Sequence, residues 1–132
     1  MTRDSKLFER GLAVRKGVLG AAYVDAAAQS ETPFTADFQT FITETAWGSI
    51  WSRPGLDRKM RSMLTIALLA ALGHPEELKL HIRATRNTGV SLEDVKEILL
   101  HTAIYAGVPA ANSAFHHAQI AYEQLEAAEK AP

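Results

Sequence analysis

The chain contains no cysteine, carries almost no net charge and has no long apolar run, and each absence excludes a class of protein. Without cysteine there are no disulfides, no thiolate metal ligands and no thiol nucleophile, which is typical of a reducing compartment. A formal net charge of −1 gives no electrostatic reason to expect nucleic acid or a membrane surface as a partner. The longest apolar run, MLTIALLAALG, is shorter than the roughly 20 residues that a membrane-spanning helix needs.

What is present indicates a single folded domain. A hydrophobic content of 47% with 22% charged residues is ordinary for a globular protein. A length of 132 residues suits one domain over residues 1–132, ending in a short polar tail from about residue 126 to 132. The first ten residues, MTRDSKLFER, are charged and lack the apolar stretch of a secretory signal, so we expect a cytoplasmic protein.

The spacing of apolar residues predicts helices along nearly the whole chain, and no segment alternates as a strand would. The fold class is therefore all-α. One predicted helix, ending near Trp51, should present a single face formed by Phe38, Phe41, Ile42, Thr45, Ala46 and Ser49. The predicted helices cover residues 5–19, 21–29, about 36–51, 58–72, 75–88, 92–106 and a last segment that Pro109 opens.

Capping signals mark several of these helix ends. Thr35 is expected to cap the helix that follows it, and Pro75 is well placed as a first helical residue. Gly89 is the expected terminator of the helix that Pro75 begins. Ser91 and Asp94, three residues apart, resemble a capping box with a shorter carboxylate.

Frequent alanine and one strongly apolar helix together predict self-association. Alanine at many apolar positions allows helices to pack closely. The helix over residues 58–72 is apolar on most of its surface, more than a chain of this size can bury alone. We therefore expect a homo-oligomer.

Glu77 and His81 are the first candidates for chemistry. Four residues apart on a helix, they lie on one face, with the carboxylate on the N-terminal side. Such a pair either transfers protons or forms a solvated ion pair at the border of the apolar stripe, and the spacing alone favours the ion pair. The related ladder of Glu97, His101 and Tyr105 favours packing or a subunit contact.

Arginines and tryptophans form the second group. Arg58 and Arg61 share a face in the first turns of a helix, where they either clamp a carboxylate or phosphate or are simply solvated. Trp47 and Trp51, four apart, are expected to stack along one helix face, either as core residues or as the wall of an apolar pocket.

The remaining histidines and the common motifs are less informative. His116 and His117 diverge by about 100° on a helix, which leaves His116 nearer a flank. His74 and His81 are separated by a proline and make a poor metal site. No HExxH, GxGxxG, P-loop or GxSxG motif occurs, and we expect no metal or other cofactor.

Long blocks of the sequence resemble a known family. The stretch RPGLDRKMRSMLTIALLAALGHPEELKLHIRATRNTGVSLEDVKEILLHTAIYAGVPAANSAFHHA is joined by the upstream pieces GLAVRKGVLG, YVD, TPFTADFQ and WGSIWSRPGL. In this order and spacing they resemble the carboxymuconolactone decarboxylase family, within the alkylhydroperoxidase-D-like superfamily. The resemblance covers nearly the whole chain except the C-terminal tail.

The resemblance implies both an architecture and a reaction. The architecture is a bundle of about six to seven helices in a ring-shaped homo-oligomer, a hexamer or a trimer. The reaction is cofactor-free decarboxylation of 4-carboxymuconolactone, a lactone dicarboxylate, to 3-oxoadipate enol-lactone in the protocatechuate branch of the β-ketoadipate pathway. Peroxidases of the wider superfamily use a CxxC pair, and His74 and Glu77 stand roughly at those cysteine positions, so the chain resembles the decarboxylase branch.

The resemblance and the needs of the reaction assign expected roles. His81, at the position of the superfamily's histidine, is the expected proton donor to carbon. Glu77 is expected to keep His81 charged by raising its pKa, and Arg61 to face the developing oxyanion. The expected substrate-binding residues are Arg58, Trp47, Trp51 and His116.

The sequence departs from the family pattern at one position, and two alternative functions remain open. The family usually has histidine where Tyr23 stands, which leaves the exact substrate open, although tyrosine can also donate a hydrogen bond. The first rival is a related decarboxylase or isomerase of another unsaturated lactone or small acid. The second is a non-catalytic helical oligomer that binds small carboxylates.

Overall fold

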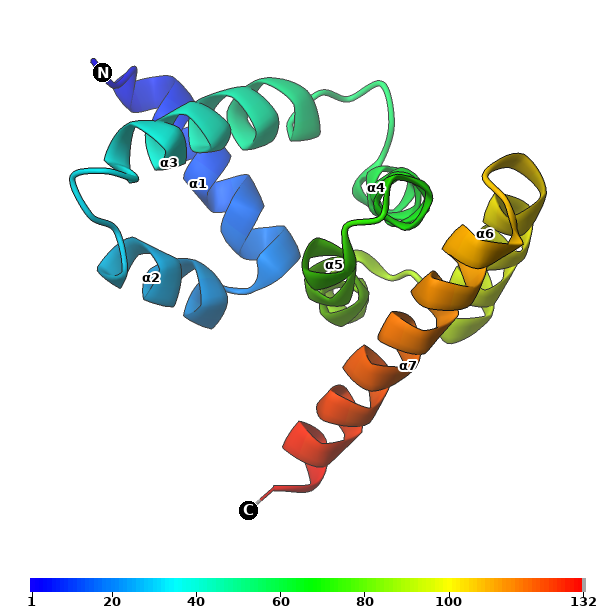
Figure 1. Cartoon of the computed structure of the whole chain (residues 1–132). Coiled ribbons are helices and arrows are strands. Elements are labelled where there is room, and N and C mark those ends of the chain that lie inside the picture. Colours follow the sequence, from blue (N-terminus) through cyan, green and yellow to red (C-terminus); the bar gives the residue numbers. More distant parts are fainter. Residues whose placement is uncertain (132) are drawn as a thin grey trace. The chain divides into compact units, whose positions relative to one another are not determined.

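The computed structural model of the chain describes residues 1–131 and is helical from one end to the other (Figure 1). No strand occurs in this part of the chain, which confirms the all-α prediction. The elements are α1 (Ser5–Leu19), α2 (Ala21–Gln29), α3 (Ala36–Ile42), the π-helix η1 (Thr43–Trp51), α4 (Arg58–Leu72), α5 (Pro75–Thr88), α6 (Leu92–Tyr105) and α7 (Val108–Lys130).

The chain divides into two compact units, and each is described by itself. The first unit is Met1–Arg58, with α1, α2, α3 and η1, and the second begins at Lys59 and holds α5, α6, α7 and nearly all of α4. The single domain over residues 1–132 stays a prediction.

Most helix boundaries agree with the sequence analysis because local signals set them. Pro75 begins α5, and Gly89 ends it with a left-handed φ of 82°. Ser91 and Asp94 form the predicted capping box: the Ser91 hydroxyl accepts from the Asp94 amide at 2.9 Å, and the Asp94 carboxylate accepts from the Ser91 amide at 3.0 Å. One end prediction was wrong, because Thr35 makes no capping bond to α3 and bonds Thr32 instead. The last helix, α7, continues to Lys130, so the polar tail is helical up to that residue.

The face predicted for the helix over residues 36–51 is not the face that the fold buries. Phe38 and Phe41 are 60% and 49% exposed, whereas the residues buried there are Thr40, Thr43, Trp47 and Gly48. Helical spacing identifies residues that share a face, but the face that becomes buried is the one that a neighbouring helix covers, and here α1 contacts Thr43 and Gly48.

In the first unit, α1 and η1 meet backbone to backbone. A Cβ atom built on Gly11 would overlap the carbonyl oxygen of Thr43, and one built on Gly48 would lie 2.8 Å from the carbonyl oxygen of Leu7. Only glycine at both positions permits this approach. The contact lets α1 lie directly on the face of η1 that carries Thr43 and Trp47.

In the second unit, four helices enclose one apolar core. α5 and α6 both pack against α7, and α6 lies beside it along its N-terminal half (Figure 1). The alanines of α7 allow this close packing, as the sequence predicted. The core residues are Ile66 and Ala70 of α4, Leu78 and Ile82 of α5, Val90, Val95 and Leu99 in and before α6, and Ala114, Ala118 and Ala121 of α7.

Replacing Gly11 with alanine should destabilise the first unit. The new methyl group would overlap the Thr43 carbonyl, and overpacking of this kind lowers the free energy of unfolding by about 1–3 kcal/mol or more. Urea denaturation of the two proteins measures the difference. Gly55→Ala is the matched control, because a Cβ there meets nothing within 4 Å. Equal stability of Gly11→Ala and the control would contradict the backbone contact.

Candidate functional site

The two tryptophans lie together in the first unit, as predicted. Trp47 and Trp51 lie on one side of η1, with ring centroids 4.9 Å apart and planes inclined by 34°. Trp47 is buried and Trp51 is half-buried, so the pair extends from the interior of the unit to its surface. Such a pair presents a large apolar area with two indole N–H donors.

Arg58 is held near the C-terminal end of α1. A Cβ atom built on Gly17 would lie only 2.6 Å from the Arg58 Nη1 atom, so the guanidinium occupies the space beside that glycine. Arg61 follows in α4, where it is half-buried, whereas Arg58 is exposed. Both arginines lie in the first turn of α4, next to the positive end of the helix dipole, where an anion is favoured.

Sequence reasoning missed a buried arginine in the same unit. Arg15 is only 8% exposed, and its Nη1 donates to the side-chain oxygens of Gln39 at 3.2 Å and Thr43 at 3.5 Å. Burial lowers the pKa of Arg15, and the phenol of Tyr23 on α2 raises it by a smaller amount. The signal was visible in the sequence, since Arg15 stands four residues after Gly11 within the apolar stripe of α1.

In the second unit, His81 is buried instead of lying at the border of the apolar stripe. It is 9% exposed and shares the inner face of α5 with Leu78 and Ile82. Burial lowers its pKa from 6.5 to about 4, because an apolar environment disfavours the charged imidazolium. The imidazole is therefore neutral near pH 7.

The expected effect of Glu77 on His81 was wrong in direction. Glu77 lies exposed in the first turn of α5, and burial alone sets the pKa shift of His81, which is downward instead of upward. A carboxylate in water has little influence on a charge inside the protein, because solvent screens it. In the first turn, Glu77 instead complements the positive end of the helix dipole.

The other histidines lie nearer the surface. His116 is exposed on α7, as predicted for a flank, while His117 is half-buried. Within residues 1–131, the buried Nδ1 atom of His117 has no hydrogen-bond partner. His101 is exposed on α6, with its ring centroid 4.9 Å from that of Tyr105, so packing in the core of the chain is excluded.

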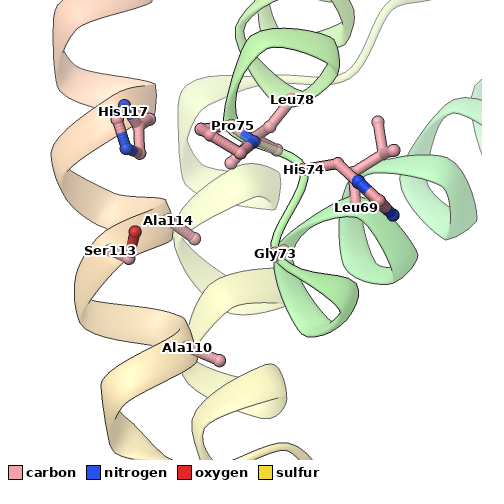
Figure 2. A pocket seen from close by; sticks show the side chains of 10 residues that line it. Leu69, Gly73, His74, Pro75, Leu78, Ala110, Ser113, Ala114 and His117 are labelled. Carbon is pink, nitrogen blue, oxygen red and sulfur yellow. The ribbon is translucent and has the colours of Figure 1, made fainter.

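A small pocket lies between the start of α5 and α7 (Figure 2). Its volume is about 220 Å³, and its polar side chains come from His74, Ser113 and His117. Figure 2 shows His117 on α7 opposite Pro75 and Leu78. None of the seven residues expected to form the site lines this pocket.

The structure also bears on metals and membranes. Among residues 1–131, no three histidine, aspartate or glutamate side chains cluster in a way that could hold a metal ion. None of the helices in this described part combines the length and the apolar character that crossing a membrane requires.

Comparisons with known proteins show the ancestry of the chain. The sequence pattern of the carboxymuconolactone decarboxylase family matches residues 36–119. The chain belongs to this family. It is 46% identical, over 92% of its length and 91% of the relative, to a 4-carboxymuconolactone decarboxylase of Acinetobacter baylyi. It is also 49% identical, over 79% of its length and 73% of the relative, to a nitrosuccinic acid decarboxylase of Metarhizium robertsii.

The extent of the family match separates the site residues into two groups. The matched segment contains the tryptophan pair, both α4 arginines, His81 and His116. Helices α1 and α2 precede it, so Arg15 and Tyr23 lie outside the part that this carboxymuconolactone decarboxylase family member shares with the family pattern.

Acidification should destabilise the protein through His81. The pKa is about 4 in the folded protein and 6.5 in the unfolded chain, so the unfolded chain binds the proton first. Stability that is fully present above pH 6.5 is therefore lost as the pH falls toward 4. Between pH 7 and pH 5 this one group should account for a loss of about 2 kcal/mol.

Urea denaturation of the wild type and His81→Gln at both pH values isolates this contribution, since glutamine does not titrate. An NMR titration of the His81 ring gives its pKa directly. A ring that titrates at or above pH 6.5 would contradict the buried, neutral state.

Proposed function

We propose that this chain is a decarboxylase and that its substrate is 4-carboxymuconolactone. The observation that carries the proposal is the 46% identity to a 4-carboxymuconolactone decarboxylase over almost the full length of both chains. The step belongs to the protocatechuate branch of the β-ketoadipate pathway, and we place it in the cytoplasm.

The chemistry of this substrate defines what the protein must supply. The bond between the ring carbon and one carboxylate breaks, carbon dioxide leaves, and the electron pair spreads through the ring double bond to the lactone carbonyl oxygen. A proton from water then adds to a ring carbon and gives the enol-lactone. Because the lactone itself accepts the electrons, the scheme needs no cofactor, only charge stabilisation, exclusion of water and orientation.

His81 acts in this scheme as a neutral hydrogen-bond donor. With a pKa of about 4, the imidazole is not the charged acid that the sequence suggested. Its N–H group stabilises the developing oxyanion without a proton transfer, and a buried donor does so more strongly than one in water. We assign Glu77 no part in charging His81.

The other expected residues keep their proposed roles. Arg61 stabilises the oxyanion together with His81, and Arg58 holds the carboxylate that stays on the substrate. The tryptophan pair gives the departing carboxylate an apolar surface, which favours the neutral product carbon dioxide. His116, exposed on α7, is a further proposed contact of the substrate.

Nitrosuccinate is a second candidate substrate, which the 49% identity to a nitrosuccinic acid decarboxylase favours. This compound also has two carboxylates, and loss of the one beside the nitro group leaves electrons that the nitro group accepts. The two candidates thus share a departing carboxylate, an electron-accepting group and a spectator carboxylate. Tyr23 stands where the family usually has histidine, so we propose this side chain as one that distinguishes the two candidate substrates.

Purified protein should remove the ultraviolet absorbance of 4-carboxymuconolactone and release one carbon dioxide per lactone. His81→Gln should lower kcat/KM by at least about 100-fold, the usual effect of removing one oxyanion donor. His74→Gln, which changes an exposed histidine that has no part in the proposed site or interface, is the control and should keep wild-type activity.

Three results would contradict parts of this proposal. Faster turnover of nitrosuccinate than of the lactone would make nitrosuccinate the substrate. A loss of less than about 10-fold in His81→Gln would exclude His81 as the donor. A fall of kcat as the pH rises from 6 to 8 that disappears in His81→Gln would show that the charged imidazole is required.

We also propose that the chain forms a homo-oligomer through the outer faces of α4 and α6. A groove of about 340 Å³ separates these helices, with Met60, Leu64 and Ala67 on one wall and Ile98 and His101 on the other. Apolar side chains around the groove are unusually exposed for a small protein. They are Leu64 at 47%, Leu68 at 59%, Leu72 at 68%, Leu100 at 50% and Ile104 at 78%. A trimer or a hexamer satisfies this proposal.

Leu68→Asp should convert the oligomer into monomers, because it places a charge in the middle of the apolar face. Light scattering on a size-exclusion column gives the mass of each variant. Asn112→Asp adds the same charge at an exposed position of α7 outside the groove and should leave the mass unchanged. A wild-type monomer at micromolar concentration would contradict the proposal.

A further inference from the structure

Arg15 has an unused binding edge inside the first unit. The guanidinium has five N–H donors, and both of its hydrogen bonds leave from Nη1. No residue among 1–131 accepts from Nε, although that atom is buried. The edge formed by Nε and Nη2 carries two parallel N–H groups, the arrangement that binds a carboxylate through two hydrogen bonds.

The charge of Arg15 is also uncompensated. Its two partners, the Gln39 amide and the Thr43 hydroxyl, are neutral, and no carboxylate in the described chain forms an ion pair with it. Burying a charge without an opposite charge is costly. A neutral side chain would make similar bonds to Gln39 and Thr43 at lower cost, so a purely structural role does not explain an arginine here.

The surroundings of Arg15 match the remaining parts of the substrate. Thr43, its hydrogen-bond partner, lies four residues before Trp47, and both are buried on η1. The Tyr23 phenol on α2 lies close enough to act on the charge of Arg15, and Tyr23 is 43% exposed. A guanidinium, a phenol and an indole therefore come from α1, α2 and η1 of one unit.

We propose that Arg15 binds a carboxylate of the substrate through its Nε and Nη2 edge, with the Tyr23 hydroxyl as a second donor to the same anion. This inference rests on the proposed function, since it assigns the carboxylate that remains on the substrate to Arg15, with Arg58 assisting. Because Nε has no exposed surface, side chains that cover it move when the carboxylate enters. Both residues precede the segment matched by the family pattern, as suits a contact that distinguishes this substrate from those of other members.

Steady-state kinetics with 4-carboxymuconolactone test the role of Arg15 in turnover. Arg15→Gln should lower kcat/KM by roughly 10- to 100-fold, mainly through KM, and Arg15→Lys should recover only part of the loss because lysine lacks the fork. Tyr23→Phe should raise KM by a smaller factor. Arg10→Gln, an exposed position on the same helix, is the matched control and should match the wild type.

Binding of succinate gives a readout that does not depend on turnover. Succinate, and not the neutral succinamide, should raise the Tm of the wild type and of Arg10→Gln, and this rise should be absent in Arg15→Gln. In the wild type, succinate should also shift the NMR signal of the Arg15 Nε–H group, a measurement that applies even if the variants fail to fold.

The outcomes separate the two proposals. If the lactone is not decarboxylated but succinate acts through Arg15, the proposed function fails and the carboxylate site remains. If Arg15→Gln is less stable yet keeps its KM and its succinate response, Arg15 is only structural and the inference is overturned. An Arg15 Nε–H signal that succinate leaves unchanged also overturns it.

Discussion

The close approach of α1 to η1 is the contact on which the chemistry of the first unit depends. Gly11 and Gly48 remove the two Cβ atoms that would otherwise separate the helices. One turn beyond Gly11, the Arg15 side chain is then carried below the surface, against Thr43 of η1. Thr43 and Trp47 are both buried on η1, the helix that this backbone contact joins to α1.

The second unit also contains a buried group that can carry a charge, the imidazole of His81. α5 turns His81 inward with Leu78 and Ile82, and the apolar core then determines its protonation state. The loss of hydration outweighs any benefit from the exposed Glu77 carboxylate, so His81 is neutral near pH 7. This result changes the chemistry that can be assigned to the residue, from proton transfer to hydrogen-bond donation.

Each unit, taken by itself, contains chemical groups of the kind that the proposed reaction needs. The first unit contains guanidinium groups and indoles, which suit an anion whose departing part becomes neutral. The second unit contains a buried imidazole, to which the proposal gives the role of donor to the developing oxyanion. Two relatives of the chain are named as decarboxylases of different acids, 4-carboxymuconolactone and nitrosuccinic acid, so similar sequences are associated with more than one substrate.

Local sequence determined the helices of this protein, and tertiary contacts determined which faces of them are used. Glycine, proline and capping residues act within a few positions along the chain, which is why α5 could be placed from Pro75 to its end before Gly89. The resemblance correctly predicted the family, and the four-residue spacing correctly predicted that Trp47 and Trp51 lie together. The π-helix, the burial of Arg15 and the lowered pKa of His81 could not be predicted in this way. Each depends on which distant segments exclude water from a given side chain, and that is decided only when the helices pack.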